Sequence, residues 1–320
     1  MILVSAIVPT YNRSYVIAEA IRSILNQSYP RVEIIVVDDG STDDTLVKLE
    51  EFGEKIRVIS QANAGPAAAR NRGIGESRGQ ILTFLDSDDV WLPTYIERQA
   101  AVLERAGETV PCSLANGWLE FADGQKRTAF GYADLIPDHE EGLWTNPDEI
   151  FATRFIQFNQ MVAVRRSALD RVGPFDSSLR YLEDWDLALR LSLGRPWCFV
   201  REPLVIWRQR KKDSLSRAAQ SDDLALRRSV VAVRKRAIKM FQDQNCSPNL
   251  HRLMVRELGH NNRELRAATL SARGKFGSLL GTALKGAEKV REFALARSNA
   301  YPKMRIGSIG SGVNIGALVS

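Results

Sequence analysis

The chain has 320 residues, of which 44% are apolar and 26% are charged. This is the composition of an ordinary globular protein, so it excludes a disordered chain and a fibrous repeat. Cys112, Cys198 and Cys246 stand far apart without ligand-like spacing, which argues against a disulfide framework or a zinc site and favours a reducing compartment.

Charge is distributed unevenly along the chain. Residues 201–320 contain 24 Lys and Arg against 9 Asp and Glu, a net charge of +15, whereas residues 1–200 contain 20 against 29, a net charge of −9. An acidic front suits metal ions and cation-bridged ligands, and a basic back suits an anionic surface such as phospholipid. Because no nucleic-acid-binding motif accompanies the basic part, we expect no nucleic-acid partner.

Strand and helix patterns alternate over residues 1–90. Apolar runs predict buried strands at 2–8, 32–37, 56–59 and 81–85, and apolar stripes at helical spacing predict helices at 15–25, 42–52 and 67–77. We therefore expect an α/β fold around a central, mostly parallel sheet. Ligands of such sheets bind outside the carboxyl ends of the strands.

The pattern is less regular beyond residue 90. It predicts a helix over 91–106, strands over 158–164 and 197–207, a helix that begins near Glu183, and a basic amphipathic helix containing Leu226 to Phe241. The segment 111–143 shows no clear periodicity. We expect a domain at 1–216, with a nucleotide-binding part at 1–110 and an acceptor-binding part at 111–216. A basic helical extension follows at 217–320, with a mobile tail beyond Arg305.

Two carboxylates at spacing two, Asp86 and Asp88, follow the fourth predicted strand. Their oxygens are suited to Mg²⁺ or Mn²⁺, and such an ion can neutralise a departing diphosphate. A turn or a helix cap uses the same residue types, so this short pattern alone does not decide between the two interpretations.

Polar and aromatic side chains also follow the other predicted strands. Asp39 can accept from a base N–H or a ribose hydroxyl, although the same position suits a strand-to-helix turn. Tyr11 can stack on a nucleobase or simply pack at a strand end. Arg70 can pair with a base or a phosphate, or be a solvated charge on a helix.

The order of these motifs is more informative than any one of them. The sequence resembles glycosyltransferase family 2 over about residues 1–216, on the motifs Val8-Pro9-Thr10-Tyr11-Asn12-Arg13, Val37-Asp38-Asp39-Gly40-Ser41-Thr42-Asp43, Asn63-Ala64-Gly65, Ala69-Arg70-Asn71-Arg72-Gly73, Phe84-Leu85-Asp86-Ser87-Asp88-Asp89 and Glu183-Asp184-Trp185-Asp186-Leu187.

The resemblance implies the GT-A fold and an inverting transfer of a sugar from a nucleotide-sugar donor, a UDP-sugar above all, to a glycan or lipid-linked acceptor. It implies assistance by Mn²⁺ or Mg²⁺ and a role in polysaccharide or glycoconjugate assembly. Asp184 matches the catalytic base, Asp88 the metal ligand, Asp86 the ribose contact and Asp39 the base contact. The other donor-site residues would be Pro9, Thr10, Tyr11, Arg13, Asn63, Arg70, Ser87 and Glu183.

The chemistry of Asp184 can also be argued from first principles. A sugar hydroxyl is a poor nucleophile until its proton is taken, and one positioned carboxylate contributes about 10²–10⁴-fold as a general base. Inversion needs only this base. The helix dipole also favours acidic residues such as Glu183 and Asp184 at a helix N-terminus, and the two roles are compatible.

One segment departs from the family pattern. Family members often carry a His shortly after a Tyr-Arg or Trp-Arg pair, but none follows Trp207-Arg208 here. Because cations can neutralise a diphosphate directly, we hypothesise that Arg208, Arg210 and Lys211 form a phosphate-contacting loop. A solvated basic loop is the alternative.

Other functions and locations follow from the same sequence. A sugar nucleotidylyltransferase would need a Gly-rich loop after the first strand, where Pro9-Thr10-Tyr11-Asn12 stands. A non-catalytic nucleotide-sugar binder remains an alternative. The basic helix would pack on the catalytic domain or lie on an anionic membrane. We expect no signal peptide, no transmembrane span and a cytoplasmic location, peripheral to the inner membrane face. Candidate sugar-stacking residues are Trp118, Trp144 and Phe158.

Overall fold

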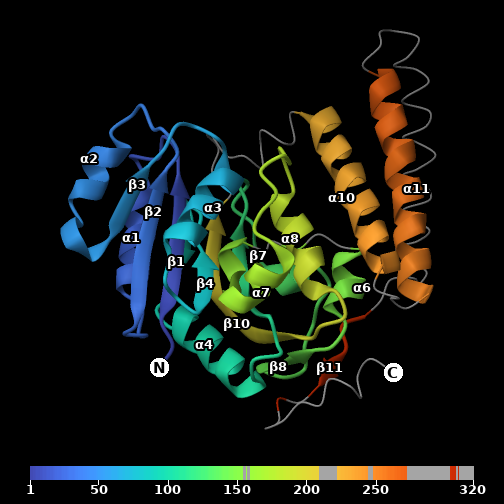
Figure 1. Ribbon diagram of the computed structural model, residues 1–320, viewed down its shortest axis with the longest axis horizontal. Coiled ribbons are helices and arrows are strands. Elements are labelled where there is room, and N and C mark those ends of the chain that lie inside the picture. Colours follow the sequence, from blue (N-terminus) through green and yellow to red (C-terminus); the bar gives the residue numbers. More distant parts are fainter. Residues whose placement is uncertain are drawn as a thin grey trace.

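The structure, a computed structural model, describes residues 1–153, 156, 159–208, 222–243, 248–271, 303–307 and 309. A central sheet is flanked by helices, and two long helices stand side by side at the end of the molecule opposite α2 (Figure 1). The strands of the sheet run in the order β11-β8-β10-β6-β9-β4-β1-β2-β3.

The N-terminal half of the sheet is parallel. It consists of β1 (Val4–Thr10), β2 (Val32–Asp38), β3 (Arg57–Ser60) and β4 (Ile81–Phe84). The helices between these strands are α1 (Ile17–Leu25), α2 (Thr45–Glu50) with the short η1 (Gly53–Lys55), and α3 (Pro66–Glu76). The predicted α/β fold with a parallel sheet core is confirmed, and the carboxyl ends of β1, β2 and β4 lie at one edge.

The other half of the sheet is mixed. Its main strands are β6 (Cys112–Glu120), β8 (Glu141–Trp144), β9 (Val162–Arg165) and β10 (Trp197–Arg208). Strand β9 is antiparallel to both β4 and β6 and so joins the halves. β6, parallel to β10, falls in the segment that showed no periodicity. Most of its residues are buried on both faces, and therefore no alternation marks it.

Shorter elements and helices complete the fold. They are β5 (Val90–Trp91), α4 (Tyr95–Ala106), β7 (Lys126–Thr128), α5 (Ala129–Tyr132), α6 (Pro147–Phe151), η2 (Asn159–Met161), α7 (Arg166–Val172), α8 (Glu183–Ser192), α10 (Asp223–Asp243), α11 (Pro248–Ser271) and β11 (Ile306–Gly307). Helix α10 contacts α8 and α11, as Figure 1 shows.

Part of the C-terminal segment returns to the sheet. Strand β11 pairs antiparallel with β8, although the sequence placed these residues in a mobile tail. The Arg305 carbonyl accepts from the Thr145 N–H at 2.9 Å, and the Arg305 N–H donates to Asn146 Oδ1 at 2.7 Å. Among the described helices, none is both long and apolar enough to cross a membrane.

Close packing of α3 on β1 places one side of the site. A Cβ atom at Gly73 would collide with the side chain of Ile7, so only glycine lets the helix approach the strand this closely. Arg70, one turn earlier on the same helix, is thereby held beside the end of β4.

Candidate active site at the carboxyl ends of the strands

A cavity of about 630 Å³ opens at this edge of the sheet, a size typical of small-molecule sites. Its lining residues are Pro9, Thr10, Tyr11, Asn12, Arg13, Asp39, Asn63, Gly65, Pro66, Ala69, Arg70, Asp86, Ser87, Asp88, Trp207 and Arg208. The fold therefore brings together almost every described residue that the sequence assigned to donor or metal binding. Within the described chain, Glu183 and Asp184 are not among the lining residues; they lie next to the cavity and connect to it through Arg70.

Asp39 organises the loop at the end of β3. Its Oδ1 accepts from Gln61 Nε2 at 2.7 Å and from the Ala64 N–H at 2.9 Å, and its Oδ2 accepts from the Gly65 N–H at 2.8 Å. An ionised carboxylate offers about four acceptor positions, so these bonds leave room for one ligand donor. Asp39 thus has two effects: it lines the cavity itself, and it holds the loop that places Asn63 there.

The loops after β1 and β2 are tied together. Asn12, with a φ of 52°, accepts the Thr42 N–H on Oδ1 at 2.8 Å, and its own N–H donates to Ser41 Oγ at 2.9 Å. Tyr11 is left 43% exposed at the cavity, as a stacking role requires. Among the described residues, the buried Thr10 hydroxyl has no hydrogen-bond partner, which suits a polar ligand beside it.

Arg70 joins three elements. Its Nη2 donates to Asp86 Oδ1 at 2.6 Å, and its Nη1 donates to Glu183 Oε1 at 2.8 Å. The guanidinium lies 5.5 Å from the centre of the Phe175 ring and is 3% exposed. With its amide turned, Asn159 accepts from the same guanidinium at 3.2 and 3.3 Å. Arg70 lines the cavity and bridges two carboxylates, and its predicted contact with the nucleotide stays a prediction.

Asp184 lies in the first turn of α8 with a pKa raised to about 7. Burial is the largest cause, and the negative charge of Glu183 adds to it, while the charge of Arg70 acts in the opposite direction. The Trp185 N–H donates to Asp184 Oδ1 at 2.8 Å. A carboxylate whose pKa lies near neutrality is well matched to general-base catalysis at that pH.

Asp89 is a site residue to which the sequence assigned no role. It is 2% exposed, and its Oδ1 accepts from the Arg208 N–H at 2.9 Å, which fixes the end of β10 beside the cavity. Burial raises its pKa well above the usual range, and the charges of Asp88 and Asp86 add to this. Arg208 itself pairs with Glu19 at 2.7 Å. Arg210 and Lys211 lie outside the described residues.

The carboxylates at the cavity fit a divalent ion that is bound partly by the protein and partly by the phosphates of a ligand. Asp88 and Asp86 both line the cavity, and Mg²⁺ is commonly bound by one or two carboxylates together with phosphates and water. Arg13 Nε lies 4.0 Å from Asp88 Oδ2. Within the described part of the chain, no group of three His, Cys, Asp or Glu side chains forms a cage for a metal.

Aromatic residues near the site differ from those that the sequence suggested. Trp144 is fully buried and packs on Trp197, so it cannot stack on a sugar. Lys126 Nζ lies 5.0 Å from the centre of the Trp118 ring. Phe158 lies outside the described residues. Trp207 lines the cavity instead. Its place beside Arg208 at a strand end was the signal that could have identified it.

Curated relatives of the chain are named as glycosyltransferases. It is 31% identical over 212 residues to the putative glycosyltransferase EpsH of Bacillus subtilis, which covers 64% of this chain and 60% of EpsH. It is 43% identical over 101 residues to the putative teichuronic acid biosynthesis glycosyltransferase TuaG of the same organism, over 30% of this chain and 40% of TuaG. The chain spans 67%, 63%, 54% and 60% of the length of four curated relatives that it matches.

Solved structures share the fold at low sequence identity. TarS residues 1–349 of S. aureus, in complex with UDP-GlcNAc, superimposes with a TM-score of 0.62 at 17% identity over 98% of this chain and 97% of that one. The mannosyltransferase PcManGT of Pyrobaculum calidifontis, in complex with GDP-Man and Mn²⁺, superimposes with a TM-score of 0.56 at 19% identity, over 93% of this chain and 81% of that one. The sequence pattern of glycosyl transferase family 2 matches residues 5–173, more than half of the chain. With the GT-A fold and this match, the chain belongs to glycosyl transferase family 2.

Proposed function

We propose that the chain transfers a sugar, with inversion, from a nucleoside-diphosphate sugar to an acceptor hydroxyl in polysaccharide or glycoconjugate assembly. The arrangement of Arg70 carries this proposal, because it joins Asp86 in the donor cavity to the Glu183-Asp184 pair. Nucleotide sugars bound to TarS and PcManGT, and the name of TuaG, support the donor class and the pathway.

The geometry suggests a division of roles. The nucleoside would lie against Tyr11, Asp39 and Asn63, with its ribose beside Asp86 and its diphosphate beside Arg13 and Asp88. When bound, Mn²⁺ or Mg²⁺ would neutralise charge on the leaving diphosphate, and Asp88 would hold it.

Asp184 would accept the proton of the acceptor hydroxyl as the oxygen attacks the anomeric carbon. The bond from that carbon to the diphosphate oxygen breaks on the opposite face, and the nucleoside diphosphate leaves with the bonding electron pair. One base suffices, because no covalent intermediate forms. The anomeric configuration of the product, read from its NMR coupling constant, should be opposite to that of the donor; retention would contradict the proposal.

Donor binding should depend on Asp88. In a thermal-shift screen of nucleotide sugars with Mn²⁺, the matching donor stabilises the protein by about 2.7 kcal/mol at 100 times its Kd. Asp88→Asn should weaken the Mn²⁺-dependent part of binding at least about tenfold, since it removes one carboxylate charge from the ion. Asp138→Asn, at an exposed carboxylate outside the cavity, is the matched control. Equal Mn²⁺ dependence in both variants would remove Asp88 from the metal site.

We also propose that α10 contacts an anionic membrane through charge alone. Its apolar residues Val233, Ala237 and Phe241 are buried in the protein, so they cannot insert into lipid. Arg228, Lys235 and Lys239 are exposed, and their spacing places them on one face of the helix.

Changing Arg228, Lys235 and Lys239 together to Gln should weaken sedimentation with phosphatidylserine vesicles by about 10²-fold, because each cation near such a surface contributes about 1 kcal/mol. The control changes Arg22 of α1, Lys48 of α2 and Lys55 of η1 to Gln, and α2 lies at the end of the molecule opposite α10 and α11 (Figure 1). Vesicle binding that is insensitive to salt, or lost equally in both variants, would contradict a contact through α10.

A further inference from the structure

The first turn of α8 carries Asp184 and, directly after it, two side chains held by the C-terminal helix α10. Trp185 is 4% exposed and Asp186 is 3% exposed, and both contact cationic residues of α10. Neither residue belongs to the donor cavity, so their contacts are not explained by donor binding.

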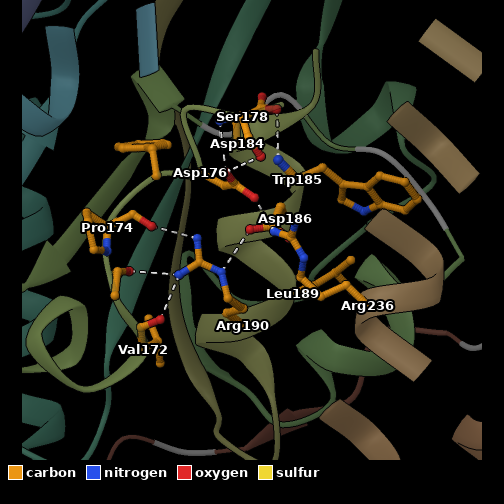
Figure 2. Close-up of polar contacts among 12 residues, drawn as sticks. Val172, Pro174, Asp176, Ser178, Asp184, Trp185, Asp186, Leu189, Arg190 and Arg236 are labelled. Carbon is orange, nitrogen blue, oxygen red and sulfur yellow. Dashed lines mark hydrogen bonds and ion pairs between the residues drawn. The ribbon is translucent and has the colours of Figure 1, made fainter. Parts of the chain in front are cut away.

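Asp186 is held from two sides, as Figure 2 shows. Its Oδ2 accepts from Arg190 Nε, one turn later on α8, at 2.8 Å, and its Oδ1 accepts from Arg236 Nη1 of α10 at 3.0 Å. Arg236 Nη1 also lies 2.6 Å from Asp176 Oδ2. Arg190 is fixed in turn by the carbonyl groups of Val172, Gly173 and Pro174.

Trp185 is held by α6 and α10. Its indole N–H donates to the Phe151 carbonyl at 2.8 Å, and the Arg234 guanidinium of α10 lies 4.9 Å from the centre of its ring. Arg234 is 5% exposed and donates to the Ala152 carbonyl. Two cations of α10 thus contact the two residues that follow Asp184.

The start of α8 needs such external support. Leu182, directly before the helix, has a φ of 67°, a left-handed conformation that is unfavourable for a residue with a Cβ atom. Its side chain makes no capping hydrogen bond to the first turn. Contacts from elsewhere must therefore keep this turn in place.

We propose that Arg236, assisted by Arg234, is a positioning residue for Asp184. By holding Asp186 it fixes the first turn of α8, and so the direction in which the Asp184 carboxylate meets the acceptor hydroxyl. The inference rests on the proposed role of Asp184 as the base. It makes α10 part of the catalytic apparatus, since an error of about 1 Å in such a placement can cost about 10²-fold in rate.

The test is kinetic. Arg236→Ala should lower kcat about 10- to 100-fold while the donor KM and Tm stay close to wild type, because Arg190 still pairs with Asp186. Arg236→Lys should recover part of the loss, since one ammonium can still reach Asp186. Arg266→Ala, at an exposed position of α11, is the control. The proposal would be overturned if Arg236→Ala kept the wild-type kcat, or if its Tm and donor affinity fell along with kcat.

A second measurement needs no donor. Hydrogen–deuterium exchange of peptides covering 182–190 should be faster in Arg236→Ala than in wild type, with peptides of β1 unchanged; unchanged exchange at 182–190 overturns the inference. With UDP-GlcNAc as the first donor assayed, Asp184→Asn is run alongside. If Asp184→Asn is as active as wild type, the proposed function fails. If it is inactive while Arg236→Ala is fully active, only the positioning role fails.

Discussion

Asp184→Asn is expected to lower kcat by about 10²–10⁴-fold while the donor KM changes little. The amide keeps the shape of the carboxylate but cannot accept a proton, and the cavity residues that would bind the donor are untouched. Steady-state release of the nucleoside diphosphate measures the effect. Asp170→Asn makes the same chemical change at an exposed position of α7 and should be neutral.

The pH dependence provides a separate check on the same residue. Because burial and the charge of Glu183 raise the pKa of Asp184 to about 7, the base is protonated below that pH. In the wild type, kcat/KM should therefore fall about tenfold for each pH unit below 7. The residual activity of Asp184→Asn should lack this fall at low pH, the acid limb of the profile. If the acid limb persisted in the variant, a group other than Asp184 would be responsible for it.

Stability should change in the opposite sense to activity. The folded state binds the Asp184 proton more tightly than the unfolded state, whose pKa is near 3.8, so ionisation destabilises the fold as pH rises from about 4 to 7. Asp184→Asn removes this cost. The variant should melt above the wild type at pH 8, and the difference should vanish below about pH 4. If the variant and the wild type had the same Tm at both pH values, the raised pKa of the buried Asp184 carboxyl would be contradicted.

The donor half of the fold could be predicted because its signals are local. The strands β1, β2 and β4 are largely apolar, buried runs followed by turn residues, and the carboxyl ends of parallel strands meet at one edge. Asp39 directly follows β2, and Asp88 lies in the loop after β4. Their convergence in one cavity therefore follows from topology alone.

The remaining elements gave weaker signals. Strand β6 is buried on both faces, so no period of two marks it. In α11 the buried positions include Leu250, Met254 and Glu257, and a carboxylate in the buried stripe conceals the helical period. Arg234 falls in the predicted basic amphipathic helix, and no pattern in the sequence distinguished it from the other cations there, but it is buried against Trp185.

Ion pairs across the chain could not be predicted from spacing. Arg70 and Glu183 are 113 residues apart, and only the folded chain shows that they meet. The sequence identified both residues and placed them in the donor site. Their mutual role, a bridge between the cavity and α8, depends on where the start of α8 lies relative to Arg70 of α3, which no local pattern specifies.

Arg70→Ala should destabilise the protein by about 3–5 kcal/mol, because Asp86 and Glu183 then lose the cation that compensates them. Urea unfolding measures this loss. Arg72→Ala, on the same helix but exposed and paired with Glu76, should change stability by no more than about 0.5 kcal/mol. A loss in Arg70→Ala as small as that of the control would show that the bridge contributes little.

The same substitution should shift the acid limb of kcat/KM. The charge of Arg70 lowers the pKa of Asp184, so its removal lets burial and Glu183 raise that pKa further, and the limb moves to higher pH. Arg70→Lys keeps the charge but not the planar fork that spans Asp86 and Glu183. Arg70→Lys should therefore bring the acid limb back close to its wild-type pH, while the free energy of unfolding recovers less.

In a Glu183→Gln background, Arg70→Ala should lower the free energy of unfolding by less than in the wild type, since one of the two uncompensated carboxylates is already gone. An acid limb that stays in place in Arg70→Ala would mean that Arg70 does not act on the base, and that the bridge is structural only.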